Sequence, residues 1–498
     1  MSIHLIRASI LLLSSLAFFQ YPPAYAAEER SPLTHGVMVG EVNQDSAVIW
    51  ARTDRESTMH AWLRPAGGGA LSHGQIAVSP DHDYTGKVLF RDLKPDSDYL
   101  YAVRFGGDAS PPLRDPLSGR FRTAPAPDVA KSVRFAWGGD LAGQNVCRDA
   151  REGFPIFAAL NRSHWDFFVA MGDMIYADDA CDARGKYGNE QVPGEFGPAA
   201  NKSDFWAHWR YSRDDRGFRD LLSTTPYLPV WDDHEVVNDF GPLQDTRDGQ
   251  PYTAGQHLLP IGLAAFLDYN PIVPGDEVPF RLYRNIRWGK HVELLLLDTR
   301  QYRDANSAED RADRPKTMLG REQLTWLKAK LKASNATWKF IVSSVSISTP
   351  TGSTPDKGRD GWANGDQSTG FEQELLNLLA YMKEEGIKNA VWLAADLHFA
   401  QGLRLGAFAK EPAFVVHEFV SGPMSAGLFP NRTLDPTLKP ERLFFFGPEG
   451  SAKVETFQDA KHWMNIGAIE VNEAGALRVR VINARGDTTW TSGPLVPK

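Results

Sequence analysis

Three features are scarce in this chain, and each scarcity excludes a class of function or structure. Lysine and arginine number 54 against 62 aspartates and glutamates, which leaves a formal net charge of -8 and no basic stripe. General nucleic-acid binding is therefore not expected, because that class needs clustered positive charge. Beyond the N-terminus, no apolar run approaches the ~20 residues that a membrane-spanning helix needs. Only two cysteines are present, so the chain can form at most one internal disulfide.

The N-terminus has the parts of a cleavable secretion signal. Arg7 supplies the positive start, residues 10–19 form a short apolar core, and Ala24-Tyr25-Ala26 gives a cleavage site of small residues. A membrane anchor is the alternative, but the core is too short to span a bilayer. Paired arginines are absent ahead of the core, which favours the general secretory route. We expect residues 1–26 to be removed and the mature protein to be periplasmic or extracellular, without a transmembrane segment.

The two cysteines, Cys147 and Cys181, leave two interpretations open. In an exported protein an even number of cysteines favours a disulfide. Closing that loop would stabilise the fold by roughly 3–4 kcal/mol in the chain-entropy model. The competing interpretation is a thiolate metal ligand.

The length of 498 residues favours two domains. Residues 34–124 contain short apolar runs separated by turns rich in glycine, proline and aspartate, a pattern typical of a β-sandwich. Within them, Leu93-Lys94-Pro95-Asp96-Ser97-Asp98-Tyr99 resembles the tyrosine corner of fibronectin type III domains. In that motif the tyrosine hydroxyl ties a turn to the backbone. A stiff linker, residues 124–128, follows.

Residues 130–498 show a different pattern, in which apolar runs alternate with helical segments. Runs that are apolar on both faces, alternating with amphipathic helices, indicate sheets covered by helices. Two strand-like segments near the C-terminus, 468–471 and 477–481, add to a second sheet. The expected strands are 133–137, 166–171, 227–231, 292–297, 338–345 and 389–395, and the expected helices are 153–162, 204–211, 255–268, 320–333 and 371–385.

Four of these apolar runs are followed by acidic motifs. They read Gly138-Gly139-Asp140, Gly172-Asp173-Met174-Ile175-Tyr176, Trp231-Asp232-Asp233-His234-Glu235 and Ala395-Asp396-Leu397-His398. Because ligands bind beyond the carboxyl ends of strands in such folds, we expect these side chains to share one cleft. Carboxylates bind hard cations, and one carboxylate can bridge two of them. Phosphate-ester hydrolysis gains from such a pair of ions.

The order of these motifs resembles the metallophosphoesterase superfamily, and within it the PhoD-like alkaline phosphatase and phosphodiesterase branch. The resemblance runs from about residue 34 to the C-terminus, and it includes residues 297–303 and Phe419-Val420-Ser421-Gly422-Pro423. It implies an α/β (α+β) metallophosphoesterase sandwich, with two central sheets flanked by helices. An all-β, fibronectin-III-like domain precedes it. The expected division is 34–124 for the N-terminal domain and 130–498 for the catalytic domain.

The resemblance also implies roles for individual residues. Asp140, Asp173, Tyr176 and His398 would hold one metal, and Asp173 would bridge to a second metal. Asp233 and Asp396 would hold the second metal, with Asn238 as a further candidate. His234 would donate a proton or a hydrogen bond to the leaving oxygen.

A binuclear or trinuclear site of Fe(3+) and Ca(2+) is implied, with zinc or manganese as the alternative. Tyrosinate and carboxylate oxygens are hard donors, which suit iron(III). Carboxylates at the second site suit calcium better than zinc.

Several nearby residues carry weaker expectations. Arg148 and Arg300 could contact phosphate, although a solvated loop charge and a buried ion pair are the respective alternatives. Glu235 is expected to orient His234 or to anchor its loop, and Asp232 to lie behind the metal ligands. The chain departs from the family in two places. No thiol directly follows the first strand, and Ser343-Ser344 stands where relatives have a further histidine.

The expected function is therefore hydrolysis of phosphomonoesters, phosphodiesters or both, by attack of water on phosphorus. The substrates would be small phosphate esters or lipids. A phospholipase D-like phosphodiesterase of the same branch is one alternative. A non-catalytic secreted binding protein is the other.

Overall fold

The computed structural model describes residues 32–107, 109, 118–241, 255–273, 280–352, 357–406, 414–449 and 452–498. The expected secretion signal, residues 1–26, lies outside these ranges. None of the described helices combines the length and hydrophobicity that crossing a bilayer requires.

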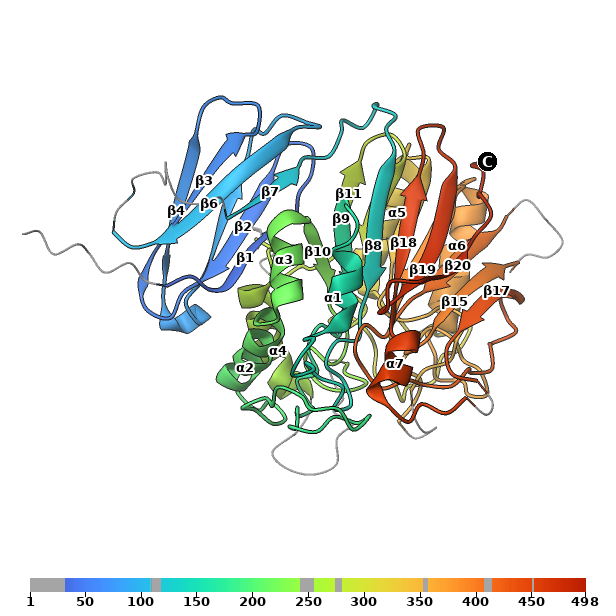
Figure 1. Ribbon diagram of the computed structural model, residues 1–498. Coiled ribbons are helices and arrows are strands. Elements are labelled where there is room, and N and C mark those ends of the chain that lie inside the picture. The colour runs from blue at the N-terminus through green and yellow to red at the C-terminus, as the bar shows by residue number, and fades with distance from the viewer. Residues whose placement is uncertain are drawn as a thin grey trace, which may run out of the picture.

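A nine-stranded sheet runs through the whole molecule (Figure 1). Its strands lie in the order β20-β19-β18-β8-β9-β10-β1-β2-β5. β8, β9 and β10 are neighbours and parallel, so their carboxyl ends reach the same edge. The bounds are β1 Thr34–Gly40, β2 Ala47–Arg52, β5 Thr85–Phe90, β8 Val133–Gly138, β9 Phe167–Met171, β10 Tyr227–Val230, β18 Asn465–Val471, β19 Leu477–Asn483 and β20 Thr488–Thr491.

A seven-stranded sheet packs against it, in the order β11-β12-β13-β14-β16-β15-β17. β12, β13, β14 and β16 are parallel, and β11, β15 and β17 pair antiparallel at the flanks. The bounds are β11 Arg284–Trp288, β12 Val292–Leu296, β13 Trp338–Val342, β14 Ala390–Ala394, β15 Ala400–Leu405, β16 Val416–Val420 and β17 Pro440–Phe446.

The N-terminal residues form a β-sandwich whose second layer is a four-stranded sheet, β4-β3-β6-β7. Its strands are β3 Ser57–Pro65, β4 Ser72–Val78, β6 Asp98–Phe105 and β7 Gly119–Arg122, and a 3-10 turn, η1, covers Pro80–His82. The facing layer, β1, β2 and β5, belongs to the nine-stranded sheet, because β1 pairs with β10. The sandwich and the catalytic part thus share one sheet, and the division at residues 124–130 stays a prediction. The expected tyrosine corner is present, since the Lys94 N–H donates to the Tyr99 hydroxyl at 2.9 Å.

Helices cover both outer faces of the paired sheets, which confirms the expected sandwich. α1 to α4 and α7 pack on the nine-stranded sheet, and α5 and α6 pack on the seven-stranded one. Capping boxes begin α2 at Asn201 and α7 at Thr456. The bounds are α1 Pro155–Leu160, α2 Lys202–Arg213, α3 Arg216–Thr224, α4 Gly255–Tyr269, α5 Gly320–Ala333, α6 Glu372–Glu384 and α7 Phe457–Trp463.

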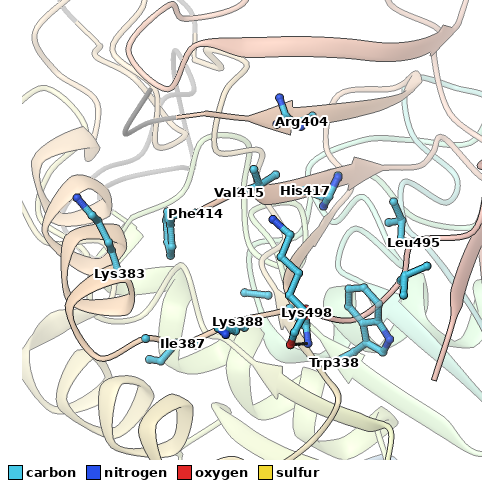
Figure 2. A pocket seen from close by; sticks show the side chains of 14 residues that line it. Trp338, Lys383, Ile387, Lys388, Arg404, Phe414, Val415, His417, Leu495 and Lys498 are labelled. Atoms are coloured by element: carbon cyan, nitrogen blue, oxygen red, sulfur yellow. Dashed lines mark hydrogen bonds between the residues drawn. The ribbon is translucent and has the colours of Figure 1, made fainter. Parts of the chain in front are cut away.

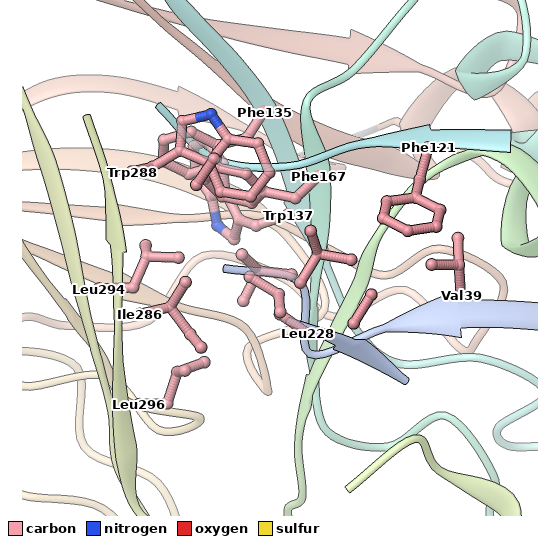
Figure 3. Close-up of a cluster of buried hydrophobic side chains, with 14 of the residues drawn as sticks. Val39, Phe121, Phe135, Trp137, Phe167, Leu228, Ile286, Trp288, Leu294 and Leu296 are labelled. Carbon is pink, nitrogen blue, oxygen red and sulfur yellow. The ribbon is translucent and has the colours of Figure 1, made fainter. Parts of the chain in front are cut away.

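The space between the two sheets is filled by aromatic and aliphatic side chains (Figure 3). Phe135 and Phe167 stack at 4.6 Å, and Phe135 meets the edge of Phe340 from the other sheet. Continuous burial along these strands explains why their sequences are apolar on both faces. The predicted strands and helices of residues 130–498 match observed elements. The elements that were not predicted are α3, α7, β11, β15 to β17 and β20.

The two cysteines form a disulfide, Cys147–Cys181, with Cα atoms 5.8 Å apart. Neither sulfur is therefore available as a thiolate, and the metal-ligand interpretation of these residues is wrong. The bridge ties the loop after β8 to the loop after β9.

Glycines let these loops approach one another. A Cβ on Gly139 would lie 2.7 Å from the Gly172 carbonyl oxygen. A Cβ on Gly172 would lie 2.5 Å from the Asp232 Cβ and 2.6 Å from its nitrogen. Gly172 also has a φ of +91°, which side chains disfavour. Gly139 and Gly172, which precede Asp140 and Asp173, are therefore small because the next loop packs directly on each of them.

We predict that Gly172→Ala lowers the free energy of unfolding by about 2–4 kcal/mol, because both overlap and backbone strain oppose the new methyl group. Gly67→Ala is the matched control, since a Cβ there meets no atom within 4 Å. Urea unfolding followed by circular dichroism measures both. Equal midpoints for the two variants would contradict the packing argument.

Candidate functional site

The acidic motifs converge at the edge where the parallel strands end. Asp140 follows β8, Asp173 follows β9 and Asp233 follows β10, while Asp396 follows β14 of the facing sheet. All four carboxylates are buried or nearly so. The sheets therefore bring together side chains that are up to 256 positions apart, counted from Asp140 to Asp396.

Four of the expected ligand residues have a left-handed backbone. The φ values are 61° at Asp140, 52° at Asp173, 65° at Asp396 and 58° at His398. Aspartate and histidine tolerate this region better than most residues, but it still costs free energy. The surrounding hydrogen bonds hold them there, since Leu141 N–H donates to the Asp173 carbonyl at 2.7 Å and Ser425 N–H to that of Asp140 at 2.9 Å.

Asp140, Tyr176 and His398 form one half of the site. The Tyr176 hydroxyl lies 3.0 Å from His398 Nε2, and Asp140 Oδ1 lies 3.8 Å from the same nitrogen. His398 Nδ1 donates to the Gly427 carbonyl oxygen, which leaves the lone pair on Nε2. Burial lowers the pKa of His398 to about 3, so the ring is neutral. A neutral imidazole fixed by a carbonyl at its far nitrogen is the usual form of a metal ligand.

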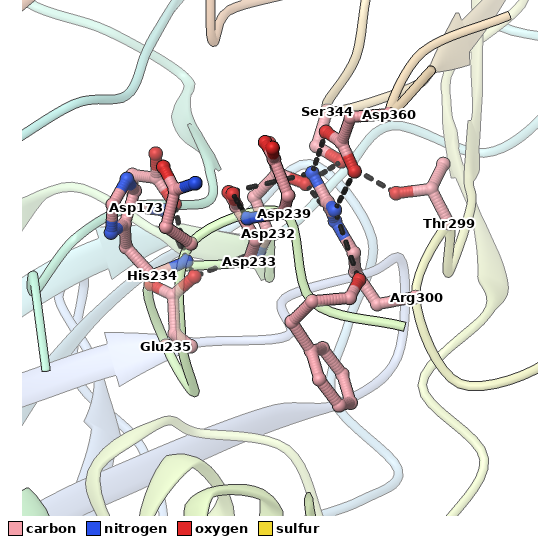
Figure 4. Close-up of polar contacts among 12 residues, drawn as sticks. Asp173, Asp232, Asp233, His234, Glu235, Asp239, Thr299, Arg300, Ser344 and Asp360 are labelled. Atoms are coloured by element: carbon pink, nitrogen blue, oxygen red, sulfur yellow. Dashed lines mark hydrogen bonds and ion pairs between the residues drawn. The ribbon is translucent and has the colours of Figure 1, made fainter. Parts of the chain in front are cut away.

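Asp233 lies at the centre of the other half (Figure 4). It belongs to three groups whose ligand atoms all lie within 4.8 Å of one another. These groups are Asp173, Asp233 and His234; Asp232, Asp233 and Asp396; and Asp233, Asp239 and Asp360.

Several buried carboxylate oxygens at this site accept no hydrogen bond, which indicates whether the site suits a cation. Among the described residues, both oxygens of Asp140, Oδ1 of Asp233 and Oδ2 of Asp396 are buried and accept no hydrogen bond. Burial and then the charge of neighbouring carboxylates raise the pKa of Asp140, Asp173 and Asp396 well above the usual range. Buried charges need compensation by a partner or a metal. The donor set therefore fits hard metal ions.

His234 contacts a carboxylate that the sequence did not point to. Its Nδ1 lies 2.6 Å from Asp178 Oδ1, and its ring stacks on Tyr176 at 4.0 Å. Burial opposes its charge, but the carboxylates of Asp178, Asp233 and Asp173 raise the pKa of His234 well above the usual range. These carboxylates favour the protonated imidazole, and Asp178 fixes the orientation of the ring through Nδ1.

Glu235 anchors the loops and does not touch His234's ring in the described contacts. Its carboxylate accepts from the backbone N–H groups of Asp232, Asp173 and Met174 at 2.8 to 2.9 Å. One side chain thereby fixes the ends of two loops, so the anchoring interpretation is the correct one.

Arg300 is fully buried, and its role differs from phosphate binding. Its Nε donates to Asp232 at 2.5 Å, and its two terminal nitrogens donate to Asp360 at 2.6 and 2.8 Å. It also contacts the Phe240 carbonyl and lies 3.4 Å from Asp233. The expectation of a substrate contact is corrected here, because every nitrogen of the guanidinium already has an acceptor.

The guanidinium of Arg148 is also engaged by other side chains of the protein. Its side chain pairs with Asp214 at 3.1 Å and stacks over Tyr211 at 4.3 Å, with 8% of the residue exposed. The structure places it against α2, and the expected phosphate contact is not supported.

The sequence missed three carboxylates of the site, and each has a structural reason. Asp178 and Asp239 lie in irregular loops, and the backbone N–H of the exposed Asn238 donates to Asp178 at 2.9 Å. Asp360 comes from the segment between β13 and α6, far from any motif. Asn238 as a metal ligand stays a prediction. At the position where the resemblance implies a further histidine, the Ser344 hydroxyl donates to Asp232 at 2.8 Å.

A cavity of about 330 Å³ lies elsewhere, at the amino ends of β13, β14 and β16 (Figure 2). Trp338, Lys388 and His417 are among its lining residues. The candidate ligands follow the carboxyl ends of strands, so this cavity is at the opposite edge of the sheet.

Comparison with known proteins agrees with this geometry. The PhoD-like phosphatase family matches residues 135–488, and its N-terminal domain matches residues 20–125. Alkaline phosphatase D of Bacillus subtilis (strain 168) is 23% identical over 436 residues, which cover 80% of this chain and 70% of that protein.

Two solved structures share the fold. A structure of PhoD superposes with a TM-score of 0.71 at 19% identity, covering 93% of this chain and 89% of the other. The purple acid phosphatase PPD1 of yellow lupin (Lupinus luteus) superposes with a TM-score of 0.60 at 11% identity, covering 93% of this chain and 74% of the other. The family match sets aside the non-catalytic alternative and identifies a hydrolase of phosphoric esters. The chain belongs to the PhoD-like phosphatase family.

Proposed function

We propose that this phosphoesterase is metal-dependent, is secreted, and hydrolyses phosphomonoesters, phosphodiesters or both. The observation that carries the proposal is the set of four buried carboxylate oxygens on Asp140, Asp233 and Asp396 that accept no hydrogen bond. Positive charge between them would stabilise their ionised form.

Asp140, Tyr176 and His398 would hold one ion, Asp233 and Asp396 would hold a second, and Asp173 would bridge them. Phenolate and carboxylate oxygens favour iron(III) at the first position and calcium at the second, with zinc or manganese as the alternative. When bound, such ions neutralise phosphate charge and activate water for attack on phosphorus. Asp239 and Asp360 could take part in a third position beside Asp233, although Arg300 already neutralises Asp360.

His234 and Asp178 supply the proton chemistry. Asp178 accepts from His234 Nδ1, which orients the ring and favours its charged form. The protonated ring can then donate from Nε2 to the departing oxygen. Asp178 acts only through His234 and is a positioning residue.

Two observations support export and a two-part organisation. The Cys147–Cys181 disulfide suits an oxidising compartment. The secretion signal expected at residues 1–26 suits the periplasm or the exterior. The proposed division is a β-sandwich over residues 34–124 and a catalytic part over residues 130–498, with β1, β2 and β5 of the sandwich continuing the nine-stranded sheet.

We predict that Asp173→Asn lowers kcat/KM by at least about a hundredfold, because the proposed bridge loses its charge. Hydrolysis of p-nitrophenyl phosphate and bis(p-nitrophenyl) phosphate measures the effect. Asp128→Asn is the matched control, because this carboxylate is exposed. Wild-type rates on both esters in the Asp173 variant would falsify the proposed site.

The leaving group provides a test of the proton donor. Asp178→Asn should reduce hydrolysis of an alkyl phosphate by about a hundredfold, but that of p-nitrophenyl phosphate far less, because nitrophenolate departs without a proton. His234→Asn should show the same selectivity. An equal loss on both esters would instead mean that the pair only maintains the shape of the site.

Metal removal is predicted to affect both activity and stability. Prolonged dialysis against a chelator should abolish hydrolysis and lower the free energy of unfolding by about 3 kcal/mol, a value expected when the ions are present at a hundred times their Kd. Iron(III) with calcium should restore both quantities. Elemental analysis that finds zinc alone in fully active protein would overturn the assignment of iron and calcium.

A further inference from the structure

A strap of residues 427–432 packs across His398 and forms one wall of the site. The Gly427 carbonyl oxygen accepts from His398, and the Phe429 ring stacks on the imidazole at 4.3 Å. Two hydrogen bonds fix the strap to the loops after β8 and β9. Gly427 N–H donates to Gln144 at 2.9 Å, and Leu428 N–H donates to the Tyr187 hydroxyl at 3.1 Å. The strap is therefore held in place by His398 and by the loops after β8 and β9.

Two cations flank this wall. A Cβ placed on Gly427 would lie 3.0 Å from Lys186 Nζ, so the ammonium group rests against the strap beside His398. The Arg432 guanidinium lies 5.9 Å from the centre of the Phe429 ring. Lys186 and Arg432 therefore both lie against the strap that packs on His398.

These cations differ from the buried arginines in having no acidic partner. Within the described ranges, neither Lys186 nor Arg432 forms an ion pair with a carboxylate, whereas Arg148 and Arg300 do. Lys186 is exposed and Arg432 is partly exposed. A hollow of about 410 Å³ adjoins Arg432 and contains Arg442, and no acidic side chain is among its described lining residues. In a protein with a net charge of -8, Lys186 and Arg432, which form no ion pair within the described ranges, are an attractive site for an anion.

We propose that Lys186 and Arg432, the cationic rim, bind a second negative charge of the substrate beyond the phosphate that is cleaved. The preferred substrates would then be phosphoesters that carry a further anionic group, such as another phosphate along a chain. The inference rests on the proposed function, because the rim is defined by its position beside His398. It also predicts poor hydrolysis of esters of choline, whose quaternary ammonium group the rim would repel.

The carboxylates at the centre of the site and the cationic rim differ in their exposure to solvent, and this difference is the physical basis of the proposal. The carboxylates at the centre are buried and would be neutralised by metal ions, so they do not attract a second cation from the substrate. The rim is open to solvent, where each ion pair contributes modestly and salt screens it. The rim should therefore set substrate preference and the salt dependence of KM, and it should leave bond cleavage unchanged.

Three p-nitrophenyl phosphodiesters of similar size test the proposal. Their second ester groups are 2-sulfoethyl, which is anionic, 3,3-dimethylbutyl, which is neutral, and choline, which is cationic. For the wild-type protein, kcat/KM should fall in that order. The double variant Lys186→Gln/Arg432→Gln should reduce the ratio of anionic to cationic substrate by about tenfold, which corresponds to about 1.8-fold for each of the two charges on each of the two substrates. The neutral ester should change less than about twofold, and added salt should reduce the wild-type preference.

The remote variant Lys388→Gln is the charge-matched control, since Lys388 lines the cavity at the opposite edge of the sheet. It should leave the ratio unchanged. If the double variant hydrolyses all three esters with the wild-type ratios, the rim has no role in recognition, and the proposed function stands. If the wild-type protein cleaves none of the three and no monoester, the proposed function itself is wrong.

Discussion

Repulsion between carboxylates that are buried together is the constraint around which this molecule is organised. Asp140, Asp173, Asp233 and Asp396 meet at the edge of two sheets, where water cannot stabilise their charge. Arg300 compensates part of this charge through Asp232 and Asp360. Asp140, Asp233 and Asp396, which are expected to bind metal, each keep at least one buried oxygen that accepts no hydrogen bond. Protein cations and metal ions thus divide the task, since Arg300 neutralises the carboxylates behind the site and the ions would neutralise those in front.

The fold meets this constraint by fixing loops with short contacts. Gly139 and Gly172 permit close approach, and Glu235 binds three backbone N–H groups from two loops. The left-handed backbone at Asp140 and Asp173 turns each chain sharply after its strand. These features cost conformational freedom, which burial of the large core between the sheets offsets. A rigid core is therefore the condition for a strained and highly charged site.

The ordered motifs made much of this arrangement predictable. An apolar run followed closely by an aspartate can be recognised in the sequence alone. Because parallel strands end at the same edge of a sheet, Asp140, Asp173, Asp233 and Asp396 could be predicted to lie together. Asp178, Asp239 and Asp360 could not, because loop packing alone determines their neighbours. Arg300 was ambiguous, since an arginine beside a motif can bind substrate or carboxylate, and only burial distinguishes the two. α3 has helical spacing at Phe218, Leu221 and Leu222 but spans only nine residues, and the antiparallel strands at the flank of the second sheet are only five to seven residues long.

Burial also separates two kinds of arginine in this chain. A guanidinium that loses its hydration must find carboxylates inside the protein, as Arg300 and Arg148 do, and it then has little left to offer a ligand. Arg432 and Lys186 keep contact with solvent and can remain without an acidic partner at lower cost. Recognition of an anion is thus expected at the rim, where charge is available, and the motif arginines serve the architecture. In an acidic phosphoesterase this division lets the site bind negatively charged substrates while its centre consists of carboxylates.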